Sequence, residues 1–300
     1  MSVIDFSGLP FPSVIEPLDF EANRTAIESD LVARFPAVAP VLQIESSITK
    51  KLVEAVATRE NRLRGRVNDA LKGVLTPFAK GSDLDNVVAR QGIERLEIPS
   101  PVEGQPAQME SDASLLRRYL LSFDIASAGS ADRYLYEAWT TWPQNADRSL
   151  GLWDARVNGF DVHGRRGDTD VVIIGPFGRL ATSSEKAAIS AAVRAPHVKP
   201  EAVSVAVLDA VRVEYTANLA IETRPGPSPD FVKADVVARI RREADKRMTI
   251  GGEIPAGFLA GVAYGDNVIT VTDLDPVAIE PDPYSVPVLT EINVIAAVRP

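Results

Sequence analysis

The stretch 215-YTANLAIETRPGPSPDFVKADVVARIRREADKRMTIGGEIPAGFLAGVAYGDNVITVTDLD-275 decides the fold of the second half of this chain. An alternating strand stops at Pro225-Gly226-Pro227. Ser228-Pro229 is typical of a helix start, where a capping side chain precedes proline at the first helical position. A Gly251-Gly252 corner, a short helix and another strand follow. The apolar stripe that predicts burial of the long helix consists of Val232, Val236, Ile240, Ala244 and Met248.

Upstream of this stretch, alternation of apolar and polar residues predicts further strands. A capping box at Thr182-Ser183-Ser184-Glu185 predicts a helix that runs through Val193. The charged and glycine-rich segment Asp161–Asp170 is typical of a hairpin loop between two strands. The predicted strands lie at Trp153–Phe160, Val171–Ile174, 203–207, 211–215, 217–221, 267–272 and 290–298.

One long helix dominates the first half of the chain. Its apolar residues recur at steps that are mostly three or four, which places them on one face. Roughly 30 residues at 1.5 Å per residue give a helix of about 45 Å. A stripe of that length needs other helices to cover it, from this chain or from another. The stripe consists of Ile44, Ile48, Leu52, Val56, Leu63, Val67, Leu71, Val74 and Phe78.

Shorter helices surround the long one. Asp19 is expected to cap a helix that ends near Arg34. Ser82-Asp83-Leu84-Asp85 fits a capping box for a helix that stops at Gly92. The two remaining helices are predicted at 111–123 and 131–141, with Ser130 capping the second.

Together these patterns predict an α+β protein with a helical N-terminal half, a long amphipathic helix and two small α+β modules. We expect an N-terminal arm and short helix over residues 1–40 and a helical core region over residues 41–150. The first module is expected over residues 151–200, and a C-terminal module for subunit pairing over residues 201–300.

Composition excludes several classes of protein. The chain has 300 residues, no cysteine and a net charge of −9. Disulfides and thiolate chemistry are therefore excluded, and the acidic balance argues against a nucleic-acid partner. Because there is neither a basic, apolar leader nor a run of about 20 apolar residues, we expect no secretion signal, no membrane partner and assembly in the cytoplasm.

Candidate catalytic groups are few. The histidines His163 and His197 lie in unrelated loops and could each act as a general base or be structural. Ser47-Ile48-Thr49-Lys50 matches a serine–lysine nucleophile pattern, but Ile48 belongs to the apolar stripe of the long helix. We expect an ordinary helix start there, and we predict no catalytic or cofactor-binding residue.

Three other short patterns have ordinary explanations. The pairs Asp83/Asp85 and Asp273/Asp275 could hold a hard cation, but helix capping and a proline-bounded turn account for them. The Arg166-Gly167-Asp168 tripeptide lies in the predicted hairpin loop. We therefore predict neither a metal site nor an integrin-type ligand.

Basic residues gather toward the end of the 229–247 helix. They could contact an acidic neighbour, or they could stabilise the helix C-terminus through its dipole, by roughly 0.3–1 kcal/mol each. Both interpretations stay open. The residues are Arg239, Arg241, Arg242, Lys246 and Arg247, and our candidates for a contact between subunits are Arg239, Arg242 and Lys246.

From about Leu42 onward, the order and spacing of motifs resemble the baseplate J-like family of contractile phage tails and tailocins. The motifs are Arg62, Arg66 and Asn68-Asp69 in the long helix, the 81–85 box, 89–95 (ARQGIER), 116–119 (LRRY), 127–130 (SAGS) with Tyr134, 224–227 (RPGP) and 251–255 (GGEIP). Two segments depart from the family pattern. The Asp154–Gly167 region is longer than usual, and the proline-rich segment Asp275–Leu289 differs from the usual end.

The resemblance implies a structural wedge subunit of a baseplate rather than an enzyme, without cofactors. Two copies would join one copy of a second wedge subunit in a heterotrimer, and six wedges would form a ring around the central hub. Implied partners include the sheath-initiator and hub or spike proteins. The core-bundle residues would be Ile44, Ile48, Leu52, Val56, Leu63, Val67 and Leu71.

Two other functions stay open from the residues alone. A tail-associated hydrolase would act through paired carboxylates, which are plentiful, although no acid and base pair can be placed in one cleft. A host-surface recognition module would favour aromatic anchors, and aromatic residues make up only 6% of the chain.

Overall fold

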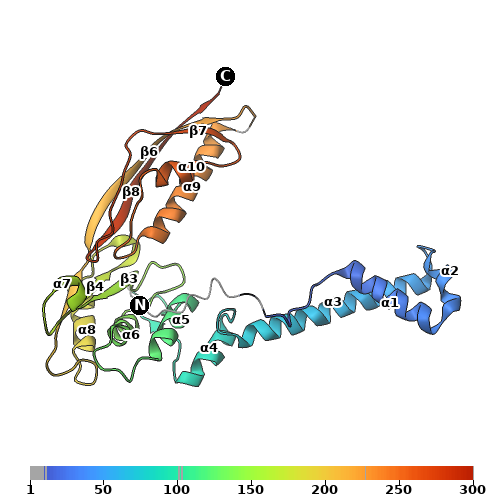
Figure 1. The fold of residues 1–300 in the computed structure, drawn as a ribbon, viewed down its shortest axis with the longest axis horizontal. Coiled ribbons are helices and arrows are strands. Elements are labelled where there is room, and N and C mark those ends of the chain that lie inside the picture. Colours follow the sequence, from blue (N-terminus) through green and yellow to red (C-terminus); the bar gives the residue numbers. More distant parts are fainter. Residues whose placement is uncertain (1–9, 11, 101, 103, 227, 300) are drawn as a thin grey trace. The chain divides into compact units, whose positions relative to one another are not determined.

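The computed structural model describes residues 10, 12–100, 102, 104–226 and 228–299, and these form two compact units (Figure 1). The described residues up to Glu94 form a helical unit, and those from Arg95 onward form an α+β unit. The predicted α+β class, with helices in the first half and sheets later, is confirmed.

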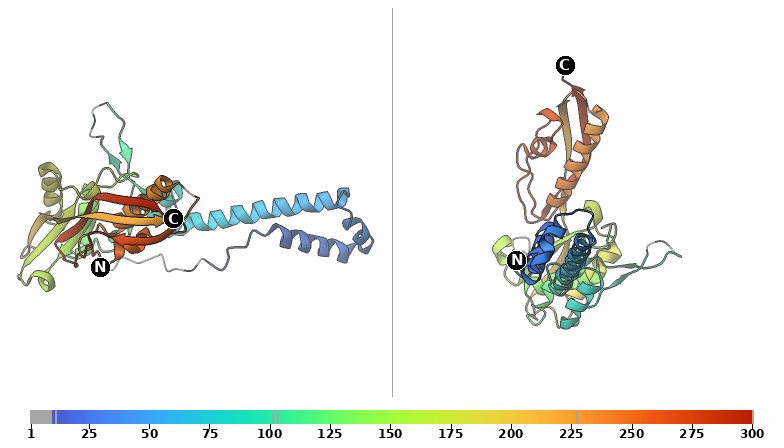
Figure 2. Two further views of the ribbon diagram at one scale, coloured as in Figure 1. Left: turned by 90° about the horizontal axis from the view of Figure 1, so that it is seen from above. Right: turned by 90° about the vertical axis from the view of Figure 1, so that its right-hand side faces the viewer.

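The helical unit is built around α3 (Ile48–Val74), with α1 (Phe20–Arg34) alongside it in Figures 1 and 2. Asp19 and Ser47 cap these two helices through their side chains, as Asp19 was predicted to do. The buried Asn68 side chain accepts from Glu16 N at 3.1 Å and donates to Glu16 O at 2.8 Å, which fastens the segment before α1 to α3. The remaining elements of this unit are η1 (Pro36–Val38), α2 (Ala39–Leu42), α4 (Ser82–Val88) and η2 (Ala89–Gln91).

The first part of the α+β unit packs helices on a small sheet. Strand β4 lies between β3 and β5, antiparallel to the first and parallel to the second. The predicted caps at Ser130 and Thr182 are confirmed, the latter with a complete capping box. The elements are β1 (Glu97–Ile98), β2 (Gln108–Met109), α5 (Asp112–Ser122), α6 (Ala131–Thr141), β3 (Asp154–Asn158), α7 (Phe160–His163), β4 (Asp168–Ile174), η3 (Pro176–Gly178), α8 (Ser183–Val193) and β5 (Ser204–Asp209).

The last part of the unit is a second three-stranded sheet with the order β7-β6-β8. Strand β6 (Val211–Thr223) pairs antiparallel with β7 (Val268–Asp273) and parallel with β8 (Ser285–Val298). Helix α9 (Pro229–Arg247) covers one face, and its whole predicted stripe is buried. The short helix α10 (Phe258–Ala263) packs beside α9. Pro227, on which the predicted break before this helix partly rests, lies outside the described residues.

The two sheets share a buried cluster. Trp153 donates from Nε1 to Met248 O at 2.8 Å, and Tyr284 donates from its hydroxyl to Asp170 Oδ2 at 2.7 Å. The apolar residues of the cluster come from both sheets: Trp153, Val172, Ile174, Ala210, Met248, Ile250, Val286 and Val288. The two sheets are therefore packed as one body.

Several local predictions are wrong. The capping box at Ser82–Asp85 is not formed: Gly81, at a φ of 53°, precedes the helix, and Ser82 is already its first residue. Glycine takes a positive φ without steric cost, so the helix begins one residue early. Phe160 begins α7 instead of ending β3, because Gly159 separates the two elements.

Strand lengths also differ from the prediction. The strands expected at 211–215 and 217–221 are one continuous strand, β6, because all their inward residues share one alternation. Strand β8 begins at Ser285, five residues earlier than expected, and contains Pro287. The predicted boundaries at residues 40, 150 and 200 stay predictions, although β5, beyond residue 200, pairs with β4.

Candidate partner interface

Helix α3 carries an apolar stripe that no other described part of the helical unit covers. Ile48 is 80% exposed, Leu52 61% and Leu63 58%. Val56, Val67 and Val74 are each more than half exposed as well. An amphipathic helix normally buries such a face, so this exposure is the main anomaly of the unit.

The face of α3 that is buried lies next to the stripe. Val53 and Ala57 are buried, and α1 packs against this side of α3. Asn23 of α1 donates to Asn61 of α3 at 2.5 Å, so a polar contact fixes the pairing of the two helices. At about 100° per residue, the stripe is displaced from this buried face by roughly a quarter of a turn. Helix α1 can therefore cover Val53 and Ala57 without covering Leu52 and Val56.

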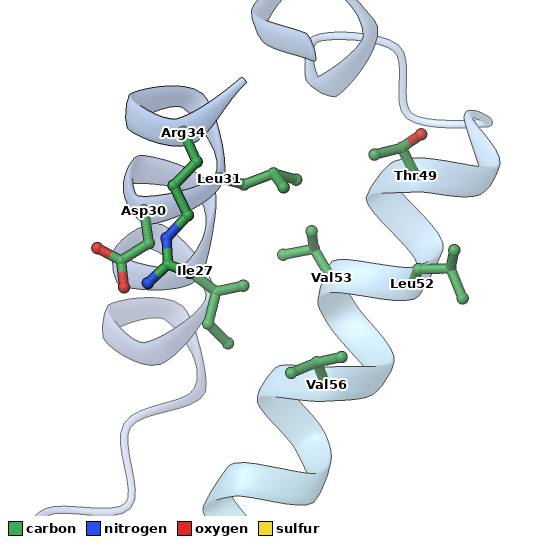
Figure 3. A pocket seen from close by; sticks show the side chains of 8 residues that line it. All are labelled: Ile27, Asp30, Leu31, Arg34, Thr49, Leu52, Val53 and Val56. Atoms are coloured by element: carbon green, nitrogen blue, oxygen red, sulfur yellow. The ribbon is translucent and has the colours of Figure 1, made fainter. Parts of the chain in front are cut away.

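A groove of about 450 Å³ runs between α1 and α3 (Figure 3). Its lining is mainly apolar, and among the described residues that line it only Asp30 and Arg34 are charged. Leu52 and Val56 belong both to the groove and to the stripe, so the two form one continuous apolar surface. The lining residues are Ile27, Asp30, Leu31, Arg34, Thr49, Leu52, Val53 and Val56.

Three arginines border the stripe further along α3. Arg59, Arg62 and Arg66 surround Leu63 in a second hollow of about 460 Å³. Within the described part of the chain, none of these three forms an ion pair, whereas the neighbouring Arg64 pairs with both Glu60 and Glu16. On a chain with a net charge of −9, this local excess of positive charge favours an acidic partner surface.

The predicted core-bundle residues all lie on this unit, but not all are equally accessible. Ile44 precedes α3 and is 54% exposed, while Leu71 is half-buried. The other five, which are Ile48, Leu52, Val56, Leu63 and Val67, form the exposed stripe itself. That a partner covers them stays a prediction.

The three basic candidates on α9 have different surroundings. Arg239 donates to Ala263 O at 3.0 Å and pairs with Asp235, and its side chain is only 21% exposed. Arg242 and Lys246 are both 64% exposed and share Glu243. Their hydrogen bonds lower the pKa of Glu243. Arg239 therefore helps to hold α9 and α10 together, and only Arg242 and Lys246 are free to reach a neighbour.

The serine–lysine pattern is a helix start in the structure. Ser47 Oγ accepts from Lys50 N at 3.1 Å, which caps α3. Lys50 pairs through Nζ with Glu45, and this hydrogen bond lowers the pKa of the Glu45 carboxyl. Because Lys50 Nζ is held by Glu45 and Ser47 Oγ is held by the Lys50 backbone, the arrangement offers no base for the serine hydroxyl.

The other chemical candidates also have structural roles. Asp83 and Asp85 lie in the first turn of α4, where acidic side chains favour the helix dipole. His163 Nδ1 accepts from Arg165 N at 3.0 Å. Asp168 pairs with Arg165 at the start of β4. Within the described residues, no three His, Cys, Asp or Glu side chains gather as a metal site would require. None of the helices in that part of the chain combines the length and the hydropathy of a bilayer span.

Comparison with known proteins agrees with the motif order. Residues 45–100 match the baseplate J-like N-terminal domain. Baseplate protein J of Escherichia phage P2 is 29% identical over 288 residues, which cover 93% of this chain and 92% of that protein. The chain is thus similar to the baseplate J-like family model in its N-terminal half and to this phage baseplate protein over nearly its whole length. The resemblance inferred from the residues is thereby confirmed, and the relationship supports a structural role in a phage baseplate.

The exposed surface lies within the part of the chain that matches the baseplate J-like N-terminal domain. Residues 45–100 contain α3 and α4, and therefore nearly the whole stripe. We did not predict from the sequence that α1 forms the other side of the groove. The pattern that could have indicated it is the spacing of Ile27 and Leu31, which are four residues apart and therefore lie on one face of α1.

Proposed function

We propose that this chain is a structural subunit of a contractile-tail baseplate and that the α3 stripe is its assembly surface. Two copies and one second wedge subunit would form a heterotrimer, with helices from all three chains covering the stripe. Six such wedges would close around the hub, in contact with the sheath-initiator and spike proteins. The function is mechanical rather than catalytic and requires no cofactor.

The exposed stripe is the observation that carries this proposal. A helix with apolar residues 51–80% exposed is costly to leave in water, since burial contributes about 25 cal/mol per Å² of apolar surface. The groove beside α1 would accept the side chains of a partner helix, and the unpaired arginines Arg59, Arg62 and Arg66 would face its acidic residues.

Charge substitutions in the stripe test the proposal. Leu52→Asp or Leu63→Asp would bury an unpaired carboxylate against the partner. We expect co-purification with the second wedge subunit to fall at least about 30-fold, the equivalent of roughly 2 kcal/mol. Because both positions are exposed in the free chain, its melting temperature should change little.

Thr58→Asp is the matched control. Thr58 is exposed on α3, on the side away from the stripe, and the same charge there should leave co-purification unchanged. The mass of the purified wild-type complex should correspond to two copies of this chain with one partner. Normal assembly by both stripe variants would refute the proposal.

A further inference from the structure

Strand β8 forms an edge of its sheet, and its outer side offers unpaired backbone groups. It is 14 residues long and pairs only with β6 in the described sheet order β7-β6-β8. Arg299 donates from its backbone N to Thr223 O at 3.0 Å, so residue 299 and the other odd-numbered residues point their N–H and C=O groups toward β6. The groups of Ile292, Val294, Ala296 and Val298 therefore face outward.

This edge lacks the features that usually prevent strands from pairing. Charged side chains, prolines and bulges protect most exposed edges. The segment 292-INVIAAV-298 contains no charge and no proline, and its pairing with β6 is regular throughout. Ile295 is 64% exposed and Val298 46%. The opposite edge, β7, is only six residues long and ends at Asp273.

The segment is self-complementary about Ile295. In an antiparallel pair centred on this residue, Val294 lies opposite Ala296 of the second copy and Ile292 lies opposite Val298. All four have outward backbone groups, so each pair can exchange two hydrogen bonds. Glu291 falls opposite Arg299 of the second copy, which gives an oppositely charged pair at each end of the contact.

We propose that β8 pairs edge to edge with β8 of a second copy of this chain, with the twofold axis at Ile295. The two sheets would then continue as one, β7-β6-β8-β8-β6-β7. A second copy is favoured as the partner because this register places Glu291 of each copy opposite Arg299 of the other. Glu291 forms no ion pair with another described residue. Arg299 reaches Glu222 only at 3.8 Å, and both of these side chains are about half exposed. The inference rests on the proposed function, which brings copies together.

The absence of cysteine makes a direct test simple. Ile295→Cys places one thiol on the twofold axis, in a non-hydrogen-bonded pair whose Cα atoms lie about 4.5 Å apart. Mild oxidation of the full chain, purified and in assembled tails, should yield a disulfide-linked dimer on a non-reducing gel. Ile295 is exposed, so the substitution should not alter the fold.

Asn293→Cys is the control for register. In the proposed register, position 293 of the second copy lies four residues further along the strand. The two thiols would be about 13 Å apart, a distance that a disulfide cannot bridge. We expect at least about tenfold less dimer than for Ile295→Cys. Mixing the Asn293→Cys and Ala297→Cys chains should restore the cross-link, since these two residues are opposite each other in the proposed register.

Two outcomes would overturn the inference. One is no Ile295→Cys dimer in either the purified chain or assembled tails, together with no cross-link in the mixed sample. The other is equal cross-linking of Asn293→Cys alone, which would mean random collision or another register. Leu52→Asp tests the proposed assembly surface on α3, whereas the cysteine variants test the pairing of β8. One of these two proposals can therefore be refuted while the other holds.

Discussion

Helices α3 and α6 are both amphipathic, yet their apolar faces have opposite surroundings. Tyr134 and Ala138 of α6 are fully buried in a core with α8, β3 and β4. Ile48 and Leu52 of α3 are mostly exposed. The face of α6 is thus covered by its own unit, whereas no described part of the helical unit covers the stripe of α3. A helix pattern alone therefore predicts burial, but not whether the covering surface belongs to the same chain.

The largest expected effect is a loss of stability when a buried ion pair of the α+β unit is broken. Arg118 pairs with Glu110 at 2.6 Å, and their side chains are 4% and 0% exposed. Arg118→Met leaves the Glu110 carboxylate buried without this partner, so we expect the free energy of unfolding to fall by about 3–5 kcal/mol. Chemical denaturation measures this change.

A double variant separates the loss of the pair from the loss of packing. Glu110→Gln combined with Arg118→Met removes the uncompensated charge, and Gln can still accept from Ser114 Oγ, which now bonds Glu110 at 2.7 Å. We expect it to recover about half of the lost stability. If the single variant is as stable as the wild type, the α+β unit does not depend on this buried pair.

Adjacent residues of α3 provide the sharpest contrast within one helix. Val53 is 5% exposed against α1, and Val53→Ala should lower the free energy of unfolding by about 2 kcal/mol. Leu52→Ala should cost less than about 0.5 kcal/mol in the free chain, but should weaken partner binding. Thermal unfolding and a pull-down of both variants check the pair. Equal destabilisation would mean that the two faces of α3 are not distinct.

The pH dependence of stability should show a contribution from the α8 cap. Burial alone would raise the pKa of Glu185, but hydrogen bonds from Arg179 and Thr182 lower it from 4.5 to about 2. Because the folded pKa is below the unfolded one, this stabilisation is present above about pH 4.5 and is lost as the pH falls toward 2. It is worth roughly 1–2 kcal/mol, after allowing for solvent screening around the partly exposed Arg179.

The matched measurement compares the wild type with Glu185→Gln. The wild type should be more stable at pH 6, and the difference should shrink to less than about half at pH 3, as follows from the two pKa values. A difference that is independent of pH would show that the carboxylate charge contributes nothing there.

The smallest effect concerns the arginines beside the stripe. Arg62→Glu should weaken association with the second wedge subunit by about 0.5–1 kcal/mol, with a stronger effect at low salt, because rim charges act through a screened field. Binding measured at two salt concentrations tests this. Tighter binding by the variant would mean that the partner surface is basic rather than acidic.

Much of the fold could be predicted from local signals. The Thr182 capping box, the Ser130 cap and the α9 stripe all appear as predicted, because each depends on residues within one helix. The start of α4 was missed because the conformation of Gly81 decided it instead of the serine.

The candidate surface could be predicted only in part. Spacing identified the apolar residues of α3, but α3 has two adjacent apolar faces, one with Leu52 and Val56 and the other with Val53 and Ala57. Which face α1 covers depends on tertiary contacts such as the one between Asn23 and Asn61. The β8 edge was missed for the same reason, since strand order is not a local property.

Thiol labelling of α3 before and after assembly tests the central claim most directly. In a chain without native cysteine, Leu52→Cys and the control Thr58→Cys each present one thiol on the same helix. Both should react with a maleimide in the free chain. In the assembled baseplate, labelling of Leu52→Cys should slow at least about tenfold, because buried thiols are inert, while Thr58→Cys stays reactive. Equal labelling of Leu52→Cys in the free and assembled states would contradict the account.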